Sequence, residues 1–328
     1  MTAVLATVLL SAVLCGLYLL LARRWQILDT PNERSSHRRP TPHGGGAPLL
    51  LAFTAGLVLA ASWYGAWNAS LVTLAGAALF LMVLGVIDDL RGLSVRLRFA
   101  IYGLLCVLVA ASLLQPVLTT NALLDGTLVL LAALVMLWSL NLYNFMDGID
   151  GIAATQCILA CCGVALLIWG TGGHGGYALF CLLLAASHCG FLMWNLPPAR
   201  LFMGDAGSIP TGFLLAGLAL LAMVQGQINP LCWLVLLAVF VTDASWTLLW
   251  RMLSGQRFTQ AHRLHAYQRL SRHWGSHLGV DLLLLALNVL WLFPLAWAVH
   301  IWPNYGFLLV ILAYLPLLWG MAKLGRLA

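Results

Sequence analysis

The stretch ASLVTLAGAALFLMVLGVIDDLRGLSVRLR, residues 69–98, decides the fold of this chain. Its first part, 69–87, carries no charged residue and is long enough to cross the hydrocarbon core of a bilayer as a helix. Because a bilayer offers no water to backbone groups, such a segment must satisfy them internally as a helix. Asp88 and Asp89 follow at once, so the stretch predicts a transmembrane helix that ends in two carboxylates at a membrane surface.

The same apolar unit recurs along the chain, which is 62% hydrophobic and only 8% charged over 328 residues. A soluble core does not need so much apolar surface. We therefore predict an all-α polytopic membrane protein, a single domain over 1–328, with about eleven transmembrane helices. The expected spans are 3–22, 47–66, 69–87, 99–118, 127–145, 152–170, 176–195, 208–226, 229–250, 279–299 and 304–322.

The basic residues predict the orientation. All 16 Lys and Arg residues fall on one side of the membrane when these spans are counted. Basic loops stay in the cytoplasm, so we expect the N-terminus outside, the C-terminus inside and the long polar loops in the cytoplasm. The net charge of +6 then reflects orientation and anionic partners. Since no aromatic-interleaved basic stripe is present, we expect no nucleic acid partner.

Seven of the ten acids lie in four short polar segments, which suggests one site at a single membrane face. Charged groups at membrane depth are costly and usually functional. The segments are DTPNERSSHRRPTPHGGG (29–46), DDLRGLSVRLR (88–98), NLYNFMDGIDG (141–151) and FMGDAGS (202–208).

Adjacent carboxylates characterise the second segment. Asp88 and Asp89 raise each other's cost of ionisation unless a cation compensates, and a row of Arg that includes Arg98 follows them. The functional interpretation is a base or metal-linked carboxylate beside an anion-binding row. The alternative is a charged helix end with local salt bridges.

Amide and carboxylate oxygens gather in the third segment. Asn141 and Asn144 lie one helical turn apart and share a face, and Asp147 and Asp150 repeat the spacing. Such oxygens suit Mg²⁺. A polar helix cap followed by a turn is the alternative interpretation.

The fourth segment predicts the start of a helix. Gly204 and Gly207 allow close approach of the backbone, and Ser208 is expected to cap the helix. Asp205 would lie at the helix N-terminus, where a carboxylate is favoured and a phosphate could also bind.

The last long loop contains AHRLHAYQRLSRHW, residues 261–274. His262, Arg263 and His265 are close enough in sequence to converge on one anion. No Cys or acid lies near enough in sequence to complete a tetrahedral zinc site. The planar fork of Arg favours phosphate instead.

Other residues of these loops have plainer interpretations. Arg34 and His37 could bind lipid headgroups, although the Pro- and Gly-rich frame of 29–46 indicates a shaped loop. A solvated amphipathic helix fits His273 and His277.

Together the parts suggest phosphoryl transfer, with acids and Asn for a metal and Arg and His for phosphates. No Walker A sequence is present. Two other classes stay open. An intramembrane aspartyl protease would use Asp147 and Asp205. A proton-coupled transporter would place charges deep within spans, where Asp243 is the exception to the interfacial pattern.

Five motifs carry a resemblance to a known family. They are DTPNERSSHRRPTPHGGG, GVIDDLRG, NLYNFMDGIDG, NLPPARLFMGDAGS and HRLHAYQ, in this order within 29–268. They resemble the polyprenyl-phosphate N-acetylhexosamine-1-phosphate transferases of glycosyltransferase family 4. The resemblance implies transfer of a sugar-1-phosphate from a UDP-N-acetylsugar to undecaprenyl phosphate with release of UMP.

The resemblance also implies roles for individual residues. Arg98 stands where relatives have a phosphate-contacting Lys, and Asp150 matches a uracil-contacting position. The cofactor would be Mg²⁺, with Mn²⁺ as a substitute. The expected catalytic residues are Asp88, Asp89, Asp147, His262, Arg263 and His265; the expected substrate-binding residues are Arg98, Asp150, Asn141, Arg34 and His37; the expected metal ligands are Asp205 and Asn144.

The late loop departs from the His run of many relatives. Its HRLHAYQ resembles members that start O-antigen or capsule chains, which implies UDP-linked N-acetylated 6-deoxyhexosamines or N-acetylglucosamine as donor. The alternative is the phospho-N-acetylmuramoyl-pentapeptide transferase. The resemblance places the enzyme in the bacterial inner membrane, with the lipid bilayer as a partner. The oligomeric state stays open, with a homodimer among the alternatives.

Overall fold

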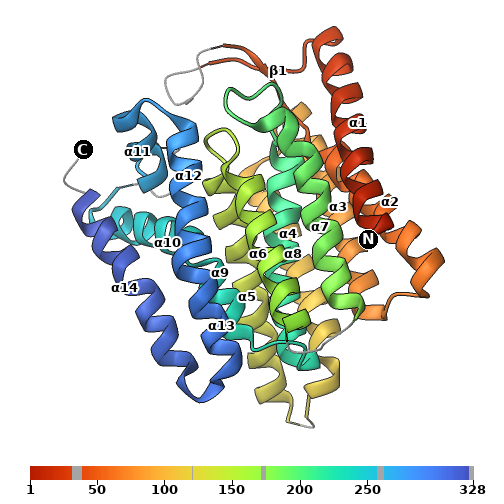
Figure 1. Ribbon diagram of the computed structural model, residues 1–328, viewed down its shortest axis with the longest axis vertical. Coiled ribbons are helices and arrows are strands. Elements are labelled where there is room, and N and C mark those ends of the chain that lie inside the picture. Colours follow the sequence, from red (N-terminus) through yellow and green to blue (C-terminus); the bar gives the residue numbers. More distant parts are fainter. Residues whose placement is uncertain (32–38, 120, 171–174, 257–261, 325–328) are drawn as a thin grey trace.

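The fold is a bundle of long helices, and the computed structural model describes residues 1–31, 39–119, 121–170, 175–256 and 262–324 (Figure 1). The helices are α1 (Thr2–Arg24), α2 (Gly46–Tyr64), α3 (Ala69–Arg91), α4 (Val95–Leu114), η1 (Gln115–Val117), α5 (Ala122–Met146), α6 (Ile152–Gly170), α7 (Gly176–Asn195), α8 (Asp205–Gln225), α9 (Pro230–Leu236), α10 (Ala238–Leu253), α11 (Ala266–Trp274), α12 (His277–Leu287), η2 (Asn288–Leu292), α13 (Phe293–Ile301), η3 (Pro303–Tyr305) and α14 (Gly306–Leu324).

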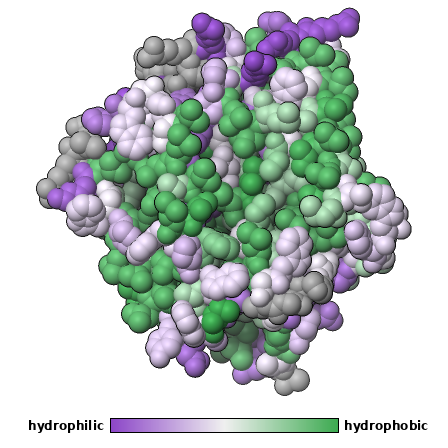
Figure 2. Space-filling view, in the orientation of Figure 1, coloured by the Kyte–Doolittle hydropathy of each residue, from purple (hydrophilic) through white to green (hydrophobic). Residues whose placement is uncertain are grey.

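The prediction of an all-α polytopic membrane protein is confirmed. In the described part of the chain, ten helical stretches are long and apolar enough to cross a membrane, and a bent pair, α9 and α10, brings the number to eleven if it is one span. Large apolar side chains cover the outer surface of these helices, as lipid contact requires. Figure 2 shows hydrophobic residues over the middle of the visible face, with hydrophilic residues at its upper, left and lower edges.

The continuous helix expected over 229–250 is wrong. α9 ends at Leu236, α10 begins at Ala238, and the two are bent by 70°. Side chains from other helices bind backbone carbonyls released near the break: Gln156 Nε2 donates to Leu236 O at 2.9 Å, and Tyr314 Oη donates to Leu234 O at 3.0 Å. A bend in a helix requires such partners for the backbone groups that it frees.

α8 lies at the centre of the bundle and is the most buried of the spanning helices. It packs against α3 and α5. Small residues allow the close contacts: a Cβ on Gly212 would lie 2.7 Å from the Ser139 carbonyl oxygen of α5. Helices in membranes associate through such small residues because lipid gives no hydrophobic drive between them.

The first polar segment forms a short hairpin that the helical prediction did not include. β1 (Leu28–Asp29) pairs antiparallel with β2 (Thr41–Pro42). The chain after β2 then binds the segment before α8, since Phe202 N donates to Pro42 O at 2.8 Å and Gly45 N donates to Phe202 O at 2.9 Å. The described part of this loop is therefore shaped, as its Pro and Gly content predicted, and it joins the N-terminal ends of α2 and α8.

Candidate active site

Arg98 connects two of the polar segments. It lies in the first turn of α4, one short turn after α3, and Ser94 caps that helix by accepting from Leu97 N. Its Nη1 donates to a carboxylate oxygen of Asp88 and, at 3.0 Å, to Oδ2 of Asp205. One guanidinium thus joins the end of α3 to the start of α8, across more than a hundred residues of sequence.

Asp88 is held on both carboxylate oxygens. Its side chain is buried, one oxygen accepts from Leu93 N at 2.6 Å, and the other accepts from Arg98. The opposite charge of the guanidinium offsets part of the water contact that the carboxylate loses on burial. Asp88 is therefore arranged to orient Arg98.

Asp89 faces the start of α8. Its carboxylate accepts from Asp205 N at 3.2 Å and from Ala206 N at 3.4 Å, so it occupies the place of a helix cap. The expectation that Ser208 caps α8 is wrong, since α8 begins at Asp205 and Gly204 is its N-cap residue with φ 72°. Ser208 lies one turn inside the helix and donates to Gly204 O. The acceptor for the first amides of α8 therefore comes from α3, and not from the helix's own Ser208 as the local sequence suggested.

Close approach of the backbone at this helix start is confirmed. Gly46 lies directly against Gly207, and a Cβ on Gly207 would lie 2.7 Å from the Gly46 Cα. A Cβ on Gly85 of α3 would lie 2.6 Å from the Cα of Ala206. These glycines let α2, α3 and α8 meet at backbone distance, which brings their polar ends together.

Asp88, Asp89 and Asp205 form a carboxylate cluster. Of Asn141 and Asn144, only Asn144 contacts it. Its Nδ2 donates to Asp205 Oδ1 at 2.7 Å and to Ser208 Oγ at 2.9 Å. The Asn141 amide instead donates to Leu137 O of its own helix at 2.7 Å. The structure therefore brings Asp205 and Asn144 together as predicted, and leaves Asn141 bonded within α5.

Asp147 ends α5 close to the same cluster. Burial raises the pKa of Asp147 well above its usual range, and the nearby carboxylates of Asp205 and Asp150 raise it further. Several carboxylates therefore share one partly buried region. Their mutual repulsion makes this region a favourable place for a cation.

Asp150 is buried and bound to its surroundings. Its Oδ2 accepts from Ala199 N at 3.0 Å and lies 3.2 Å from Nδ1 of His277, and the Asp150 amide donates to the same ring nitrogen at 3.3 Å. The interpretation of His277 as a solvated surface residue is wrong, because this side chain lies mostly buried against the predicted site segment. No periodicity in the sequence identifies this partner.

The loop of residues 262–265, called the His–Arg loop below, is held by Asp243 of α10. Asp243 of α10 lies 3.1 Å from His265 Nδ1 and accepts from Ala266 N and Tyr267 N, each at 3.0 Å. Thr247 adds a further bond at 3.2 Å. A carboxylate at the amide end of a helix is favourable, so Asp243 fixes where α11 begins. Sequence reasoning noted only that this acid was unusually deep.

Tyr267 docks the loop onto the third segment. Its hydroxyl donates to Phe145 O at 2.8 Å, and its ring stacks on His265 with centroids 5.7 Å apart. His262 lies beside His265 at 5.0 Å between ring centroids. Burial, together with the neighbouring charges of His265 and Arg251, lowers the pKa of His262 to about 4. His262 is thus neutral at ordinary pH, and the fixed positive charge of the loop comes from Arg263.

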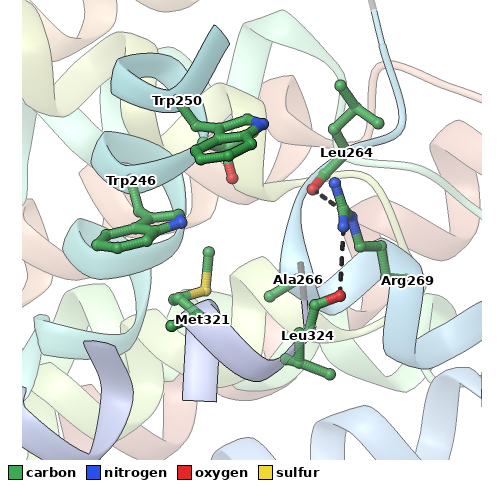
Figure 3. Close-up of a pocket in the computed structure, with 9 residues that line it drawn as sticks. Trp246, Trp250, Leu264, Ala266, Arg269, Met321 and Leu324 are labelled. Atoms are coloured by element: carbon green, nitrogen blue, oxygen red, sulfur yellow. Dashed lines mark hydrogen bonds between the residues drawn. The ribbon is translucent and has the colours of Figure 1, made fainter. Parts of the chain in front are cut away.

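A cavity of about 280 Å³ lies on the other side of this loop, between α10, α11 and α14 (Figure 3). Trp246 and Trp250 lie on its α10 side. Arg269 crosses from α11 and donates to Leu264 O at 2.9 Å and to Leu324 O at 3.3 Å. The C-terminal helix is therefore tied to the same loop. The predicted residues Arg34 and His37 lie outside the described residues.

Known proteins share sequence similarity with most of this chain. The family model described as glycosyl transferase family 4 matches residues 71–223. A decaprenyl-phosphate N-acetylglucosaminephosphotransferase of Mycobacterium leprae is 30% identical over 305 residues, covering 82% of this chain and 76% of that protein. The chain belongs to glycosyl transferase family 4.

Two further relatives are named for the transfer of different sugar phosphates. A probable undecaprenyl-phosphate N-acetylglucosaminyl 1-phosphate transferase of Bacillus subtilis is 29% identical over 76% of this chain and 71% of its own length. A phospho-N-acetylmuramoyl-pentapeptide-transferase of Synechococcus is 34% identical over 73% of this chain and 72% of its own length. The family predicted from the motifs is confirmed, and the matched region contains Asp88, Asp147 and Asp205.

The donor set of this family 4 site fits a hard divalent cation. In the described part of the chain, no three His, Cys, Asp or Glu side chains are placed to hold a metal together. Mg²⁺ does not need such a cage, because substrate phosphates and water complete its octahedron around one or two carboxylates. Asp205 offers carboxylate oxygens, and the Asn144 amide is hydrogen-bonded to one of them through its nitrogen.

Proposed function

We propose that the protein transfers an N-acetylhexosamine-1-phosphate from a UDP-N-acetylsugar to undecaprenyl phosphate and releases UMP. The observation that carries the proposal is the junction of four helix ends at one end of the bundle. Arg98 contacts Asp88 and Asp205, and Asn144 contacts Asp205. Family membership supports the same reaction class.

In the proposed reaction an oxygen of the acceptor phosphate forms a bond to the β-phosphorus of the donor. The bond from that phosphorus to the bridging oxygen breaks, and UMP leaves with the electron pair. In this proposal Arg98 binds the transferring phosphate oxygens, which its planar fork suits. Among the described residues, Asp89 accepts hydrogen bonds from two backbone amides and forms no ion pair, so it is the member of the pair that we expect to accept a proton from the acceptor.

The cofactor belongs to this proposal. Asp205 would hold Mg²⁺, with Asn144 beside it, and Mn²⁺ would substitute. When bound, the ion supplies charge that stabilises the diphosphate as it separates. Asp205→Asn should then lose most activity without unfolding, and excess EDTA should stop turnover. Full activity in EDTA would exclude the metal role and leave the transfer reaction to be judged by its products.

The Asp pair gives a second test of the proposal. Asp88→Asn and Asp89→Asn should each lower turnover by about 10²–10⁴-fold, the contribution of a positioned general base or its partner. The loss should appear in turnover more than in UDP-sugar binding. Normal turnover in both variants would make the pair a structural helix end.

We infer the donor sugar from the residues of the late loop. We place His262, Arg263 and His265 over the diphosphate and sugar of the donor. We expect UDP-N-acetyl-6-deoxyhexosamines to be better donors than UDP-N-acetylglucosamine. The lipid-linked product would then initiate a surface glycan. The preference should be modest, because an apolar wall discriminates a missing hydroxyl by only about 10–200-fold. The relative from Synechococcus favours a second candidate, the phospho-N-acetylmuramoyl-pentapeptide transferase.

One assay separates these candidates. Purified protein is incubated with undecaprenyl phosphate and a panel of UDP-N-acetylsugars, and both UMP and the lipid product are measured. Exclusive use of UDP-N-acetylmuramoyl-pentapeptide would replace the surface-glycan assignment with cell-wall synthesis. Product formation from none of the donors would refute the proposed reaction.

A further inference from the structure

A second concave surface lies away from the carboxylate cluster. It is a groove of about 600 Å³ along α1 and the end of α7. α1 presents exposed apolar side chains to it, among them Leu17, which is 54% exposed, and Leu20, which is 64% exposed. Among the predicted site residues that the structure describes, none lines this groove.

The floor of the groove is a fixed aromatic ring. Trp194, in the last turn of α7, donates from Nε1 to Ala12 O at 2.8 Å. The ring lies against α1 at Gly16, where a Cβ would approach its Cζ2 to 2.8 Å. The glycine therefore hollows the α1–α7 seam, and the Trp ring closes its inner side.

Two arginines line the same groove. Arg23 lies in the last turn of α1, and Arg200 follows α7 on a loop fixed by a bond from Arg200 N to Trp194 O at 2.8 Å. Neither forms a salt bridge with a described carboxylate. The groove therefore combines apolar walls with cationic groups from the ends of two spanning helices.

The dimensions match one leaflet of a bilayer. From Ala12 to Arg23 a helix rises about 16 Å. Half of the hydrocarbon core is about 15 Å thick. An acyl chain lying on Leu17 and Leu20 would thus place its phosphate at the level of Arg23. Guanidinium groups bind phosphate oxygens well, and basic groups at this depth attract anionic headgroups.

We propose that this groove binds one anionic diacyl phospholipid of the leaflet on the polar side of the protein. The phosphate lies between Arg23 and Arg200, and an acyl chain follows α1 past Leu17 over the Trp194 ring. This site is separate from the one that would take undecaprenyl phosphate.

The charge test uses matched double variants. Purified protein, freed of lipid in detergent, is titrated with phosphatidylglycerol or phosphatidylcholine, and bound lipid is counted by native mass spectrometry. Wild-type protein should bind one phosphatidylglycerol in preference to phosphatidylcholine. Arg23→Gln with Arg200→Gln should weaken that binding by about 30-fold, from two basic residues at a membrane surface. Arg24→Gln with Arg96→Gln removes the same charge from exposed residues outside the groove and should leave it unchanged.

The steric test leaves the charge unchanged. Leu17→Trp should fill the groove and displace the lipid, while Leu21→Trp on the same exposed helix, outside the groove, should not. Three results would overturn the proposal: equal loss in both charge variants, normal lipid binding in Leu17→Trp, or preferential capture of undecaprenyl phosphate by the groove. Conversion of a dimer to a monomer by Leu17→Trp, with lipid binding unchanged, would make the groove an interface between copies and would also overturn it.

Discussion

At the scale of the residue, Arg98 is the cation that the carboxylate cluster depends on. Arg98→Ala should lower turnover by about 10²-fold, the effect of removing one preorganised donor. It should also leave the buried Asp88 carboxylate without its cation. Arg98→Lys should recover part of the loss, because it restores the charge but not the planar guanidinium, whose Nη1 contacts both carboxylates. Initial rates and thermal unfolding measure the two effects.

A suitable control for Arg98 is Arg96→Ala in the same helix, since Arg96 is exposed. Equal losses in the two alanine variants would show that general surface charge, rather than the bridge, supports activity. A Lys variant as poor as the Ala variant would show that the planar fork, rather than the charge, is required.

His262 gives a prediction for pH at the same scale. The pKa of its imidazole falls from 6.5 to about 4 in the folded protein. Protonation therefore favours the unfolded state between these values, and stability should fall as pH falls from 6.5 towards 4. His262→Gln should reduce this acid-dependent loss. Thermal unfolding across pH measures it, and an imidazole that titrates at its ordinary pKa in nuclear magnetic resonance spectra would contradict the prediction.

At the scale of the element, Asp243 positions α11. Asp243→Ala removes the acceptor for two helix amides and for His265. The free energy of unfolding should fall by about 2 kcal/mol or more, as for a hydrogen bond to a charged group. Turnover should fall as well, because the His–Arg loop is no longer held in position by Asp243. Asp243→Asn should restore part of both quantities.

The matched control is Thr242→Val, at the residue directly before Asp243 in α10. Thr242 is buried, and its Oγ1 has no hydrogen-bond partner among the described residues. This variant should keep both stability and turnover close to wild type. If it proves as damaging as Asp243→Ala, packing of α10 rather than anchoring of the loop explains the effect.

The contact between the starts of α2 and α8 leads to a second prediction at this scale. Gly46→Ala places a methyl group against the backbone of Gly207 and Ala206, which cannot move aside as a side chain can. We expect a loss of about 1–3 kcal/mol from overpacking, together with reduced activity. Gly103→Ala faces open space in α4 and should be neutral or stabilise by about 0.5–1 kcal/mol. Equal unfolding temperatures for the two variants would contradict this contact.

At the scale of the whole molecule, the bent pair α9 and α10 determines the topology. If the pair crosses the bilayer once, the chain has eleven spans and its termini lie on opposite sides; otherwise it has ten and they lie on the same side. The one-sided distribution of Lys and Arg requires the crossing. A green fluorescent protein fused to the C-terminus should therefore be fluorescent, and an alkaline phosphatase fused there should be inactive. An active phosphatase fusion would refute this orientation.

The site was predictable in its residue types and in its location at helix ends. Asp88, Asp205 and Asn144 each end or begin an apolar span, and charges must gather where such spans meet water. The partners of those residues were not predictable in the same way. Asp89 caps a helix that begins more than a hundred residues later, and His277 binds Asp150 from another helix. A local pattern carries no signal for such distant partners.

The sequence by itself determined the fold class and the approximate positions of the apolar spans, because lipid forces every apolar segment to bond its own backbone. Only the tertiary structure decided where the ninth span breaks. No Pro or Gly lies at Leu237; the bend persists because Gln156 and Tyr314, from other helices, satisfy nearby carbonyls. The break directs α10 and Asp243 towards α11, and so the packing of the bundle, rather than the local sequence, positions the His–Arg loop.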